Sequence, residues 1–195
     1  MQNNKKRGLL IIISGPSGVG KGTVRKEFMS DPSLNLFYSV SMTTRQMRPG
    51  EQDGVDYYYV SKEEFQRNID INNFLEWAEF VGNRYGTPKD KVNMKRDEGK
   101  NVVLEIEVNG TDQVLKNLEG DDIVSIFIVP PSLEELENRL RNRGTETDEV
   151  IKRRIETASK ELKLQDHYQY VVVNDEVSRA AEEIKNIIRS RMHKA

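Results

Sequence analysis

The chain contains no cysteine among its 195 residues. Disulfide bonds and thiolate metal sites are therefore excluded, and the composition fits a reducing compartment, so we expect a cytoplasmic protein. Histidine is scarce as well: His167 and His193 lack the spacing of metal ligands, and we expect both at the surface. No apolar run approaches the roughly 20 residues that cross a bilayer. The apolar run near the N-terminus is as short as one strand and leads into a glycine-rich loop, so we expect neither a membrane span nor a signal peptide.

An excess of charge of one sign is also missing. The 30 Lys and Arg residues nearly balance the 32 Asp and Glu residues, which gives a net charge of −2. Without a strongly basic surface field or an aromatic platform, we expect no nucleic-acid partner. Repeats and low-complexity tracts are absent, and the length suits one domain with a substantial core.

The most informative stretch that is present is residues 9–23, LLIIISGPSGVGKGT. A short, β-branched run leads to Gly15, four residues, and then Gly20 and Lys21, which is the P-loop spacing. Between a strand and a helix, such a loop surrounds phosphate oxygens with N–H groups, and the lysine adds positive charge. The alternative is an ordinary glycine turn. The residues expected to bind phosphate are Gly15, Pro16, Ser17, Gly18, Val19, Gly20, Lys21, Gly22 and Thr23.

Gly22 departs from many P-loops, which carry a Ser or Thr there as a magnesium ligand. Thr23 follows it, and the order Gly-Lys-Gly-Thr also occurs in some nucleoside monophosphate kinases. We therefore expect no direct metal ligand and a metal held through water.

The order of elements predicts an α/β fold. We expect strands at 9–14, 36–41, 57–60, 74–80, 84–86, 101–107, 123–129 and 170–173, and helices at 19–29, 61–70, 89–96, 111–118, 132–141, 149–164 and 177–192. Strands that alternate with helices form a parallel sheet with helices on both faces and ligands at the carboxyl ends of the strands. The region between the first helix and residue 88 is richer in strands and forms an insertion.

Two further groups of side chains suggest chemistry. Arg45 and Arg48 lie three residues apart in a polar loop, where paired arginines bind phosphate, and Tyr57 and Tyr85 each offer a phenolic donor. The alternative is a solvated charge pair beside two half-buried tyrosines.

Glu105 and Glu107 alternate along a predicted strand and so point the same way. Acids at the end of an apolar strand cost free energy unless they are paired or bind a metal. The alternative is a polar strand end in solvent.

In their order and spacing, these segments resemble the guanylate kinase family over about residues 9–188. The matching segments are SGPSGVGKGT, SVSMTTRQMRPGE with GVDYYYV, FLEWAEFVGNRYGT, LEIEVNG, RGTETDE with IKRRI, and VVVND. The resemblance implies a three-layer P-loop NTPase fold around a central parallel sheet, with a small β-rich GMP-binding lobe and a helical lid. It further implies transfer of the γ-phosphoryl group of ATP to GMP, and to dGMP, with Mg²⁺, in purine nucleotide metabolism.

By this resemblance Arg45, Arg48, Tyr57 and Tyr85 hold the GMP phosphate, and Glu76 reads guanine. A carboxylate accepts from guanine N1–H and the N2 amino group together, whereas adenine leaves it unsatisfied. Read alone, Glu76 fits an exposed strand residue better. The other implied GMP contacts are Ser41 at O6, Thr87 near the amino group, Gly86, Glu105 and Glu107.

The resemblance also divides the roles of the acids, although the family usually carries Asp at both positions. Glu105 orders magnesium-bound water or an arginine that contacts phosphate, and Glu107 supports the base. The longer side chains leave this division open.

Phosphoryl transfer needs alignment and positive charge, and the GMP phosphate is itself the nucleophile, so no general base is expected. The catalytic candidates are Lys21, Arg45, Arg143 and Arg154, the last two at the ends of a polar segment that is a lid in similar enzymes. Helix geometry turns Arg153 about 100° away from Arg154, so only one of them faces the site. Arg139 and Asn174 are candidate adenine contacts.

The implied organisation is a single domain with a core at 7–37, 88–142 and 158–192, a GMP-binding lobe at 38–87 and a lid at 143–157. Closure of both lobes on ATP and GMP would exclude water. The sequence leaves open whether the protein is a monomer or a homodimer. Two rivals remain: a protein-binding module of the same fold, which the intact P-loop with Lys21 disfavours, and a P-loop kinase for another acceptor, which Glu76 with Ser41 disfavours.

Overall fold

A five-stranded parallel sheet forms the centre of the molecule. The computed structural model describes residues 6–118, 120, 122–142, 144 and 146–194. The strand order is β2 (Leu36–Tyr38), β7 (Asn101–Glu105), β1 (Leu10–Ser14), β8 (Ile123–Val129) and β9 (Tyr170–Val173). All neighbours are parallel. Every residue of β1 and β8 is buried, as expected of strands that helices cover on both faces.

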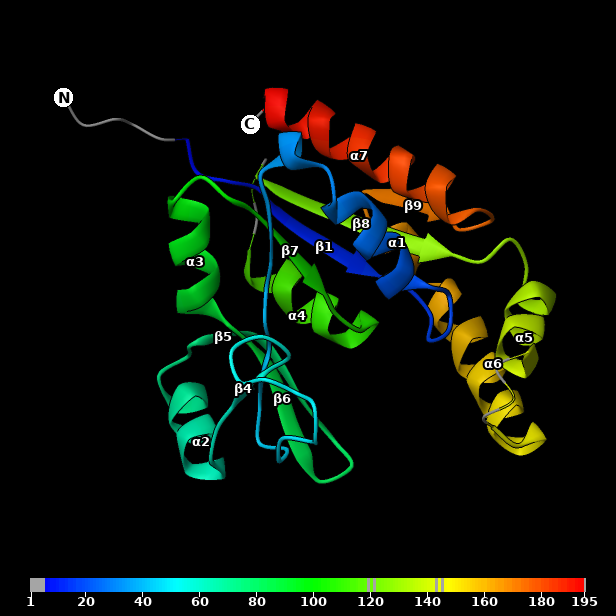
Figure 1. Cartoon of the computed structure of the whole chain (residues 1–195), viewed down its shortest axis with the longest axis horizontal. Coiled ribbons are helices and arrows are strands. Elements are labelled where there is room, and N and C mark those ends of the chain that lie inside the picture. Colours follow the sequence, from blue (N-terminus) through cyan, green and yellow to red (C-terminus); the bar gives the residue numbers. More distant parts are fainter. Residues whose placement is uncertain (1–5, 119, 121, 143, 145, 195) are drawn as a thin grey trace.

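Helices cover both faces of this sheet (Figure 1). Ile11 and Ile13 of β1 share a cluster with α1 (Lys21–Met29) and α7 (Val177–Lys194). Leu10 and Ile12 instead face α3 (Lys89–Asp97) and α4 (Val108–Asn117). Alternate side chains of one strand thus feed two cores, which confirms the predicted three-layer fold.

A second, four-stranded sheet forms the predicted β-rich insertion. Its order is β4 (Tyr58–Tyr59), β3 (Met42–Thr43), β6 (Asn83–Pro88) and β5 (Phe74–Phe80). Helix α2 (Lys62–Asp70) packs Phe65 against Met42 and Phe74. The hydroxyl of Ser61 accepts from the Glu64 N–H and so caps the start of α2. We call residues 38–87 the small lobe.

Two helices, α5 (Leu133–Asn142) and α6 (Asp148–Leu162), pack on each other through Leu136, Leu140, Ile151 and Ala158. Short 3-10 turns span Pro32–Leu34 and Gln165–His167. His167 and His193 are exposed, as expected. Within the described ranges, no helix combines the length and apolar character that a membrane crossing requires.

Several sequence predictions are wrong at their ends. The strand expected at 36–41 stops at Tyr38, and β3 begins separately at Met42. The strand expected at 101–107 stops at Glu105, and Glu107 is the N-cap of α4, which begins at Val108 and not at 111. The β7 ladder on β1 ends at the pair Ile13–Glu105, so no strand partner remains for Glu107. Glu105 and Glu107 therefore do not alternate along one strand.

Candidate active site

The P-loop follows β1 and ends at the first turn of α1. Gly20 caps the helix at φ 95°, a conformation that favours glycine, and Lys21, Gly22 and Thr23 begin the helix. A Cβ at Gly15 would lie 2.3 Å from the Ile128 carbonyl oxygen, so β8 leaves no room for a side chain there. The Lys21 ammonium donates to the carbonyls of Gly15 (2.6 Å) and Pro16 (3.2 Å). The Lys21 side chain thus folds back from the start of α1 onto the P-loop.

Asn174, at the end of β9, buttresses this loop. Its buried amide donates from Nδ2 to the Val19 carbonyl (2.8 Å), and a Cβ at Gly20 would lie 2.7 Å from that nitrogen. Arg139 of α5 donates to the Asn174 carbonyl (3.0 Å) and to Glu135 (3.1 Å). Both candidate adenine contacts therefore lie beside the P-loop, and the Asn174 side chain stabilises the loop.

Glu105 lies at the carboxyl end of β7, under the start of α1. Its Oε2 accepts from Arg25 Nε at 2.6 Å, and a Cβ at Gly22 would be 3.8 Å from its Oε1. The Arg25 guanidinium stacks 3.9 Å above the Tyr38 ring, and burial raises the pKa of Tyr38. Sequence reasoning missed Arg25, although it lies four residues after Lys21 and thus on the same helix face.

Glu107 is exposed, so the alternative of a polar position in solvent describes it better than a strand pair does. Its backbone carbonyl accepts from the Thr111 N–H (3.0 Å) in α4. Burial raises the pKa of Glu161 on α6. The negative charge of Glu107 raises this pKa further, and the positive charge of Lys21 lowers it. The end of α6 therefore brings a carboxyl near the P-loop lysine, which the sequence did not indicate.

Glu76 on β5 is half-buried and not an exposed strand residue. Thr87 on β6 donates its hydroxyl to Glu76 Oε1 at 2.6 Å. Burial raises the pKa of Glu76, and the Thr87 hydrogen bond opposes that rise. Gly110 of α4 closes this corner, because a Cβ there would lie 3.0 Å from Glu76 Oε2. Sequence reasoning missed Gly110.

The strands of the small lobe also position Ser41 and Gly86 near this corner. The Ser41 carbonyl accepts from the Tyr58 N–H (2.9 Å). A Cβ at Gly86 would lie 2.8 Å from the Phe74 ring, so the close approach of β5 and β6 requires glycine.

Arg45, Tyr57 and Tyr85 lie together on the small lobe. The Arg45 guanidinium is 5.4 Å from the Tyr57 ring centre, and the rings of Tyr57 and Tyr85 meet edge to face at 5.9 Å. Burial raises the pKa of Tyr57, so its hydroxyl stays a donor at neutral pH. The Arg48 side chain is exposed beside them. We call this group the phosphate corner.

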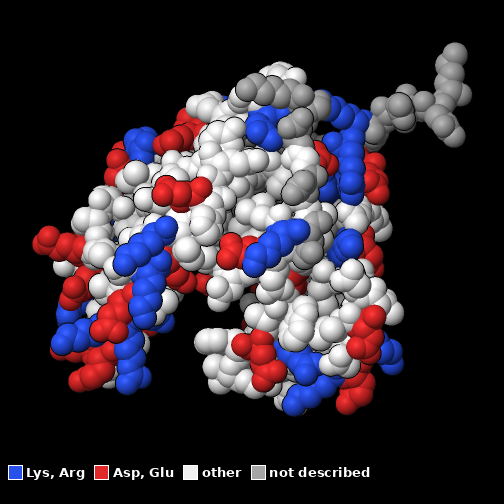
Figure 2. Space-filling model, turned by 180° about the vertical axis from the view of Figure 1, so that it is seen from behind, with Lys and Arg blue, Asp and Glu red and all other residues white. Residues whose placement is uncertain are grey.

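The lid candidates are only partly described. Arg154 of α6 forms an ion pair with Glu146 at 2.5 Å, whereas the neighbouring Arg153 is exposed. The two neighbouring side chains thus differ in their surroundings, and that only one of them faces the nucleotides stays a prediction. Arg143 lies outside the described residues. The surface is hollowed between the α5–α6 pair and the small lobe, with charges of both signs on the helices (Figure 2).

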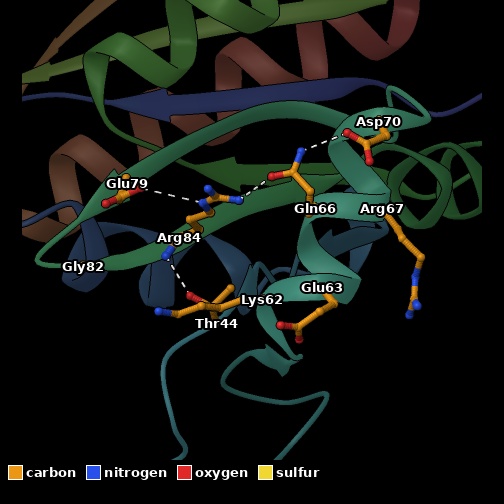
Figure 3. A pocket seen from close by; sticks show the side chains of 9 residues that line it. All are labelled: Thr44, Lys62, Glu63, Gln66, Arg67, Asp70, Glu79, Gly82 and Arg84. Carbon is orange, nitrogen blue, oxygen red and sulfur yellow. Dashed lines mark hydrogen bonds and ion pairs between the residues drawn. The ribbon is translucent and has the colours of Figure 1, made fainter.

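A separate pocket lies between α2 and the β5–β6 hairpin (Figure 3). The Arg84 guanidinium donates to Gln66 Oε1 at 2.7 Å, and the Arg84 backbone N–H donates to the Thr44 hydroxyl oxygen at 2.9 Å. Because side chains alternate along a strand, Arg84 faces this pocket while Tyr85 faces the phosphate corner. The pocket is therefore distinct from the candidate active site.

Comparison with known proteins agrees with this geometry. The sequence model of the family described as guanylate kinase matches residues 7–191. The chain belongs to the guanylate kinase family. A guanylate kinase of Streptococcus agalactiae (serotype III, strain NEM316) is 54% identical over 189 residues, which cover 97% of this chain and 90% of the relative. One from Streptococcus pyogenes (serotype M3, strain MGAS315) is 55% identical over 185 residues, covering 95% and 87%.

A solved structure is similar as well. The crystal structure of guanylate kinase from Anaplasma phagocytophilum has a TM-score of 0.73 and 35% identity, covering 95% of this chain and 87% of that one. The family resemblance inferred from the sequence is thus confirmed, and so is the P-loop NTPase fold.

Proposed function

We propose that this chain transfers the γ-phosphoryl group of ATP to the phosphate of GMP, and to that of dGMP, giving ADP and GDP. The observation that carries the choice of GMP is the half-buried Glu76 carboxylate, hydrogen-bonded by Thr87 on the same lobe as the phosphate corner. A carboxylate there can accept from both guanine donors, whereas adenine has no N1–H and could not donate to it in this way. Such a reaction belongs to purine nucleotide metabolism, in the cytoplasm.

On this proposal, the P-loop binds the ATP phosphates through residues 15–23. Lys21 exchanges its bonds to Gly15 and Pro16 for phosphate oxygens and neutralises charge on the transferred group. Arg139 and Asn174 border the adenine. The positive end of α1 adds to the same field.

GMP binds across the small lobe, with Arg45, Arg48, Tyr57 and Tyr85 around its phosphate. Ser41, Glu76, Gly86 and Thr87 surround the guanine, and Glu107 lies beyond them at the start of α4. Since the GMP phosphate is an anionic nucleophile, the side chains have to align it and screen its charge, and need not remove a proton.

Magnesium fits this site through water. In the described part of the chain, no group of three or more His, Asp or Glu side chains could hold a metal ion. Glu105 Oε1 lies near the position of Gly22 while its Oε2 is bound to Arg25, so one carboxylate oxygen can accept from a water of the metal's shell. When bound with ATP, the metal would neutralise part of the phosphate charge.

The small lobe (38–87) and a lid (143–157) would close over the core when both nucleotides are bound. Arg154 now pairs with Glu146 of the lid itself, and closure would let Arg154 turn to the triphosphate. Arg143 would contribute a second positive charge there. Closure only with both substrates excludes water and so limits hydrolysis of ATP.

A coupled ADP-release assay with ATP and magnesium tests the proposal. We expect turnover with GMP and dGMP and little with AMP, UMP, CMP or dTMP. Turnover with a different monophosphate would support phosphoryl transfer but refute the role of Glu76 in guanine recognition. A folded protein that binds GMP without any turnover would favour the binding-module alternative.

A further inference from the structure

Four hydrogen-bond donors, from Arg45 and Arg48 of the phosphate corner and from the neighbouring Tyr59, converge on the carboxylate of Glu51. Arg45 makes a bidentate pair with it, Nη2 to Oε1 at 2.8 Å and Nη1 to Oε2 at 3.0 Å. The Tyr59 hydroxyl and the Arg48 backbone N–H both donate to Oε2 at 2.8 Å. The side chains of Arg45 and Glu51 are only 13% and 21% exposed, so the pair is shielded from water more than a typical surface ion pair.

A turn delivers Glu51 to this position. The Glu51 N–H donates to the Arg48 carbonyl (3.1 Å) across Pro49 and Gly50. Proline at the second position and glycine with φ 88° at the third is the signature of a type II turn. A Cβ at Gly50 would meet nothing within 4 Å, so the position requires glycine for its backbone angle and not for space.

The contacts distinguish two roles for this carboxylate. If Glu51 stood in for the GMP phosphate, Tyr57 and Tyr85 would donate to it. It is Tyr59 that donates instead, and neither of the other two tyrosines bonds to Glu51 among the described residues. Glu51 also takes only one edge of the guanidinium, which leaves Arg45 Nε without a hydrogen bond in the described part of the chain.

We propose that Glu51 is a positioning residue of the GMP site: it fixes the Arg45 guanidinium so that the donors it leaves unused face the acceptor phosphate. The inference rests on the proposed function, because it takes Arg45 as a phosphate ligand. The hydrogen bonds from Arg45, followed by the one from Arg48, lower the pKa of Glu51 to about 2, so it is an anion wherever the enzyme works. Tyr59, with its pKa raised to about 12, remains a donor.

Glu51→Gln tests this, since it keeps the size of the side chain and removes the charge. We expect the KM for GMP to rise roughly tenfold or more, because that is the effect of losing one charge-assisted hydrogen bond. The KM for ATP should change by less than about twofold. Glu64→Gln, an exposed carboxylate of α2 in the same lobe, is the matched control and should leave both constants unchanged.

Two further variants separate positioning from a contribution to the fold. In an Arg45→Lys background, adding Glu51→Gln should have little further effect on the KM for GMP, because the residue acts through Arg45. Gly50→Ala should raise the KM for GMP in the same way by straining the turn, with all side chains of the corner retained.

Three results would overturn the inference. An unchanged KM for GMP in Glu51→Gln would remove the positioning role, and a lower one would mean that the carboxylate competes with the phosphate. Equal rises in the KM for GMP and for ATP, with a lower unfolding temperature, would assign Glu51 to the fold alone. If the wild type used another monophosphate, the proposed function would be refuted but the positioning role of Glu51 would not. The same variants would then be measured with that acceptor, because it carries the same phosphate group.

Discussion

Because Glu76 is half-buried, its ionisation should be visible in the pH dependence of GMP binding. The carboxylate must be charged to accept from two guanine donors, and burial raises its pKa. As the pH falls through this raised pKa, the KM for GMP should therefore increase, beginning at a higher pH than an ordinary glutamate near 4.5 would give. Protonation of the GMP phosphate, with a pKa of about 6, contributes to the same range.

The comparison with Glu76→Gln isolates the carboxyl. The variant should bind GMP weakly at every pH and retain only the slope that is due to the phosphate. The raised pKa of Glu76 also affects stability, because a carboxyl whose pKa is raised by folding stabilises the folded state at low pH and loses that contribution as the pH rises through the raised value. At neutral pH, Glu76→Gln should therefore unfold at a higher temperature than the wild type; the opposite result would mean that the charged form is well compensated.

Lys21 has a role that can be separated from acceptor binding. Lys21→Met removes the ammonium from the P-loop and should lower kcat roughly 10²–10³-fold, the range for loss of one charge-stabilising donor. GMP affinity, measured by calorimetry without ATP, should stay nearly unchanged. Lys62→Met, on the exposed surface of α2, is the control. Weaker GMP binding in Lys21→Met would place the lysine in the acceptor site instead.

Among single residues, the sequence predicted those that belong to motifs and missed those that act through them. Glu76 and Thr87, both predicted as guanine contacts, are hydrogen-bonded to each other, a contact that the sequence did not predict. Arg25 could have been found from its helical spacing to Lys21. Glu51 could not, because its role depends on the turn at Gly50 that folds it back onto Arg45.

At the level of elements, α4 and β5 meet where the guanine would bind. Gly110 of α4 leaves space that the Glu76 carboxylate fills. Gly110→Ala should strengthen the helix by about 0.5–1 kcal/mol and at the same time displace the carboxylate. We expect an equal or higher unfolding temperature together with a KM for GMP that is raised roughly two- to tenfold.

Asn109→Ala is the matched control for this prediction, since it changes the neighbouring, exposed position of α4. It should leave the KM for GMP unchanged. If Gly110→Ala changed neither constant, the base would lie away from this corner.

Elements that are fixed by local pattern were predicted best. The strands Ile123–Val129 and Tyr170–Val173 are found with the bounds that their apolar runs indicated. The end of β7 was not predictable in this way, because it is set by the last partner on β1 and not by the alternation of Glu105 and Glu107. Strand ends depend on neighbours that are distant in sequence, whereas strand centres depend on their own side chains.

For the whole molecule, two-sided burial of the central strands predicted the layers, but not the spatial order β2-β7-β1-β8-β9, which the crossovers determine. It also did not predict how wide the hollow between α6 and the small lobe is (Figure 2). That hollow is where the proposed closure can be measured.

The absence of native cysteine makes a clean labelling experiment possible. Phe80 at the tip of the β5–β6 hairpin is 70% exposed and Val150 of α6 is 39% exposed. With dyes on Phe80→Cys and Val150→Cys, energy transfer should increase when GMP and a non-hydrolysable ATP analogue are both bound, and less with either alone.

A pair within the core controls for direct effects of nucleotide on the dyes. Lys26→Cys on α1 and Met94→Cys on α3 lie on opposite faces of the central sheet and should give constant transfer. Constant transfer for the first pair as well would contradict closure of lid and lobe.

The attachment of Trp77 has an optical consequence. The chain has one tryptophan, and the Gln113 side chain of α4 binds both backbone groups of this residue, accepting from its N–H (3.2 Å) and donating to its carbonyl (3.1 Å). The backbone of Trp77 is thus held where the core meets the small lobe, one residue after Glu76, and its indole meets the Phe65 ring edge to face with 6.4 Å between the ring centres. Its ultraviolet emission comes from a single place in the molecule, so the unlabelled protein carries its own light signal for the arrival of the acceptor.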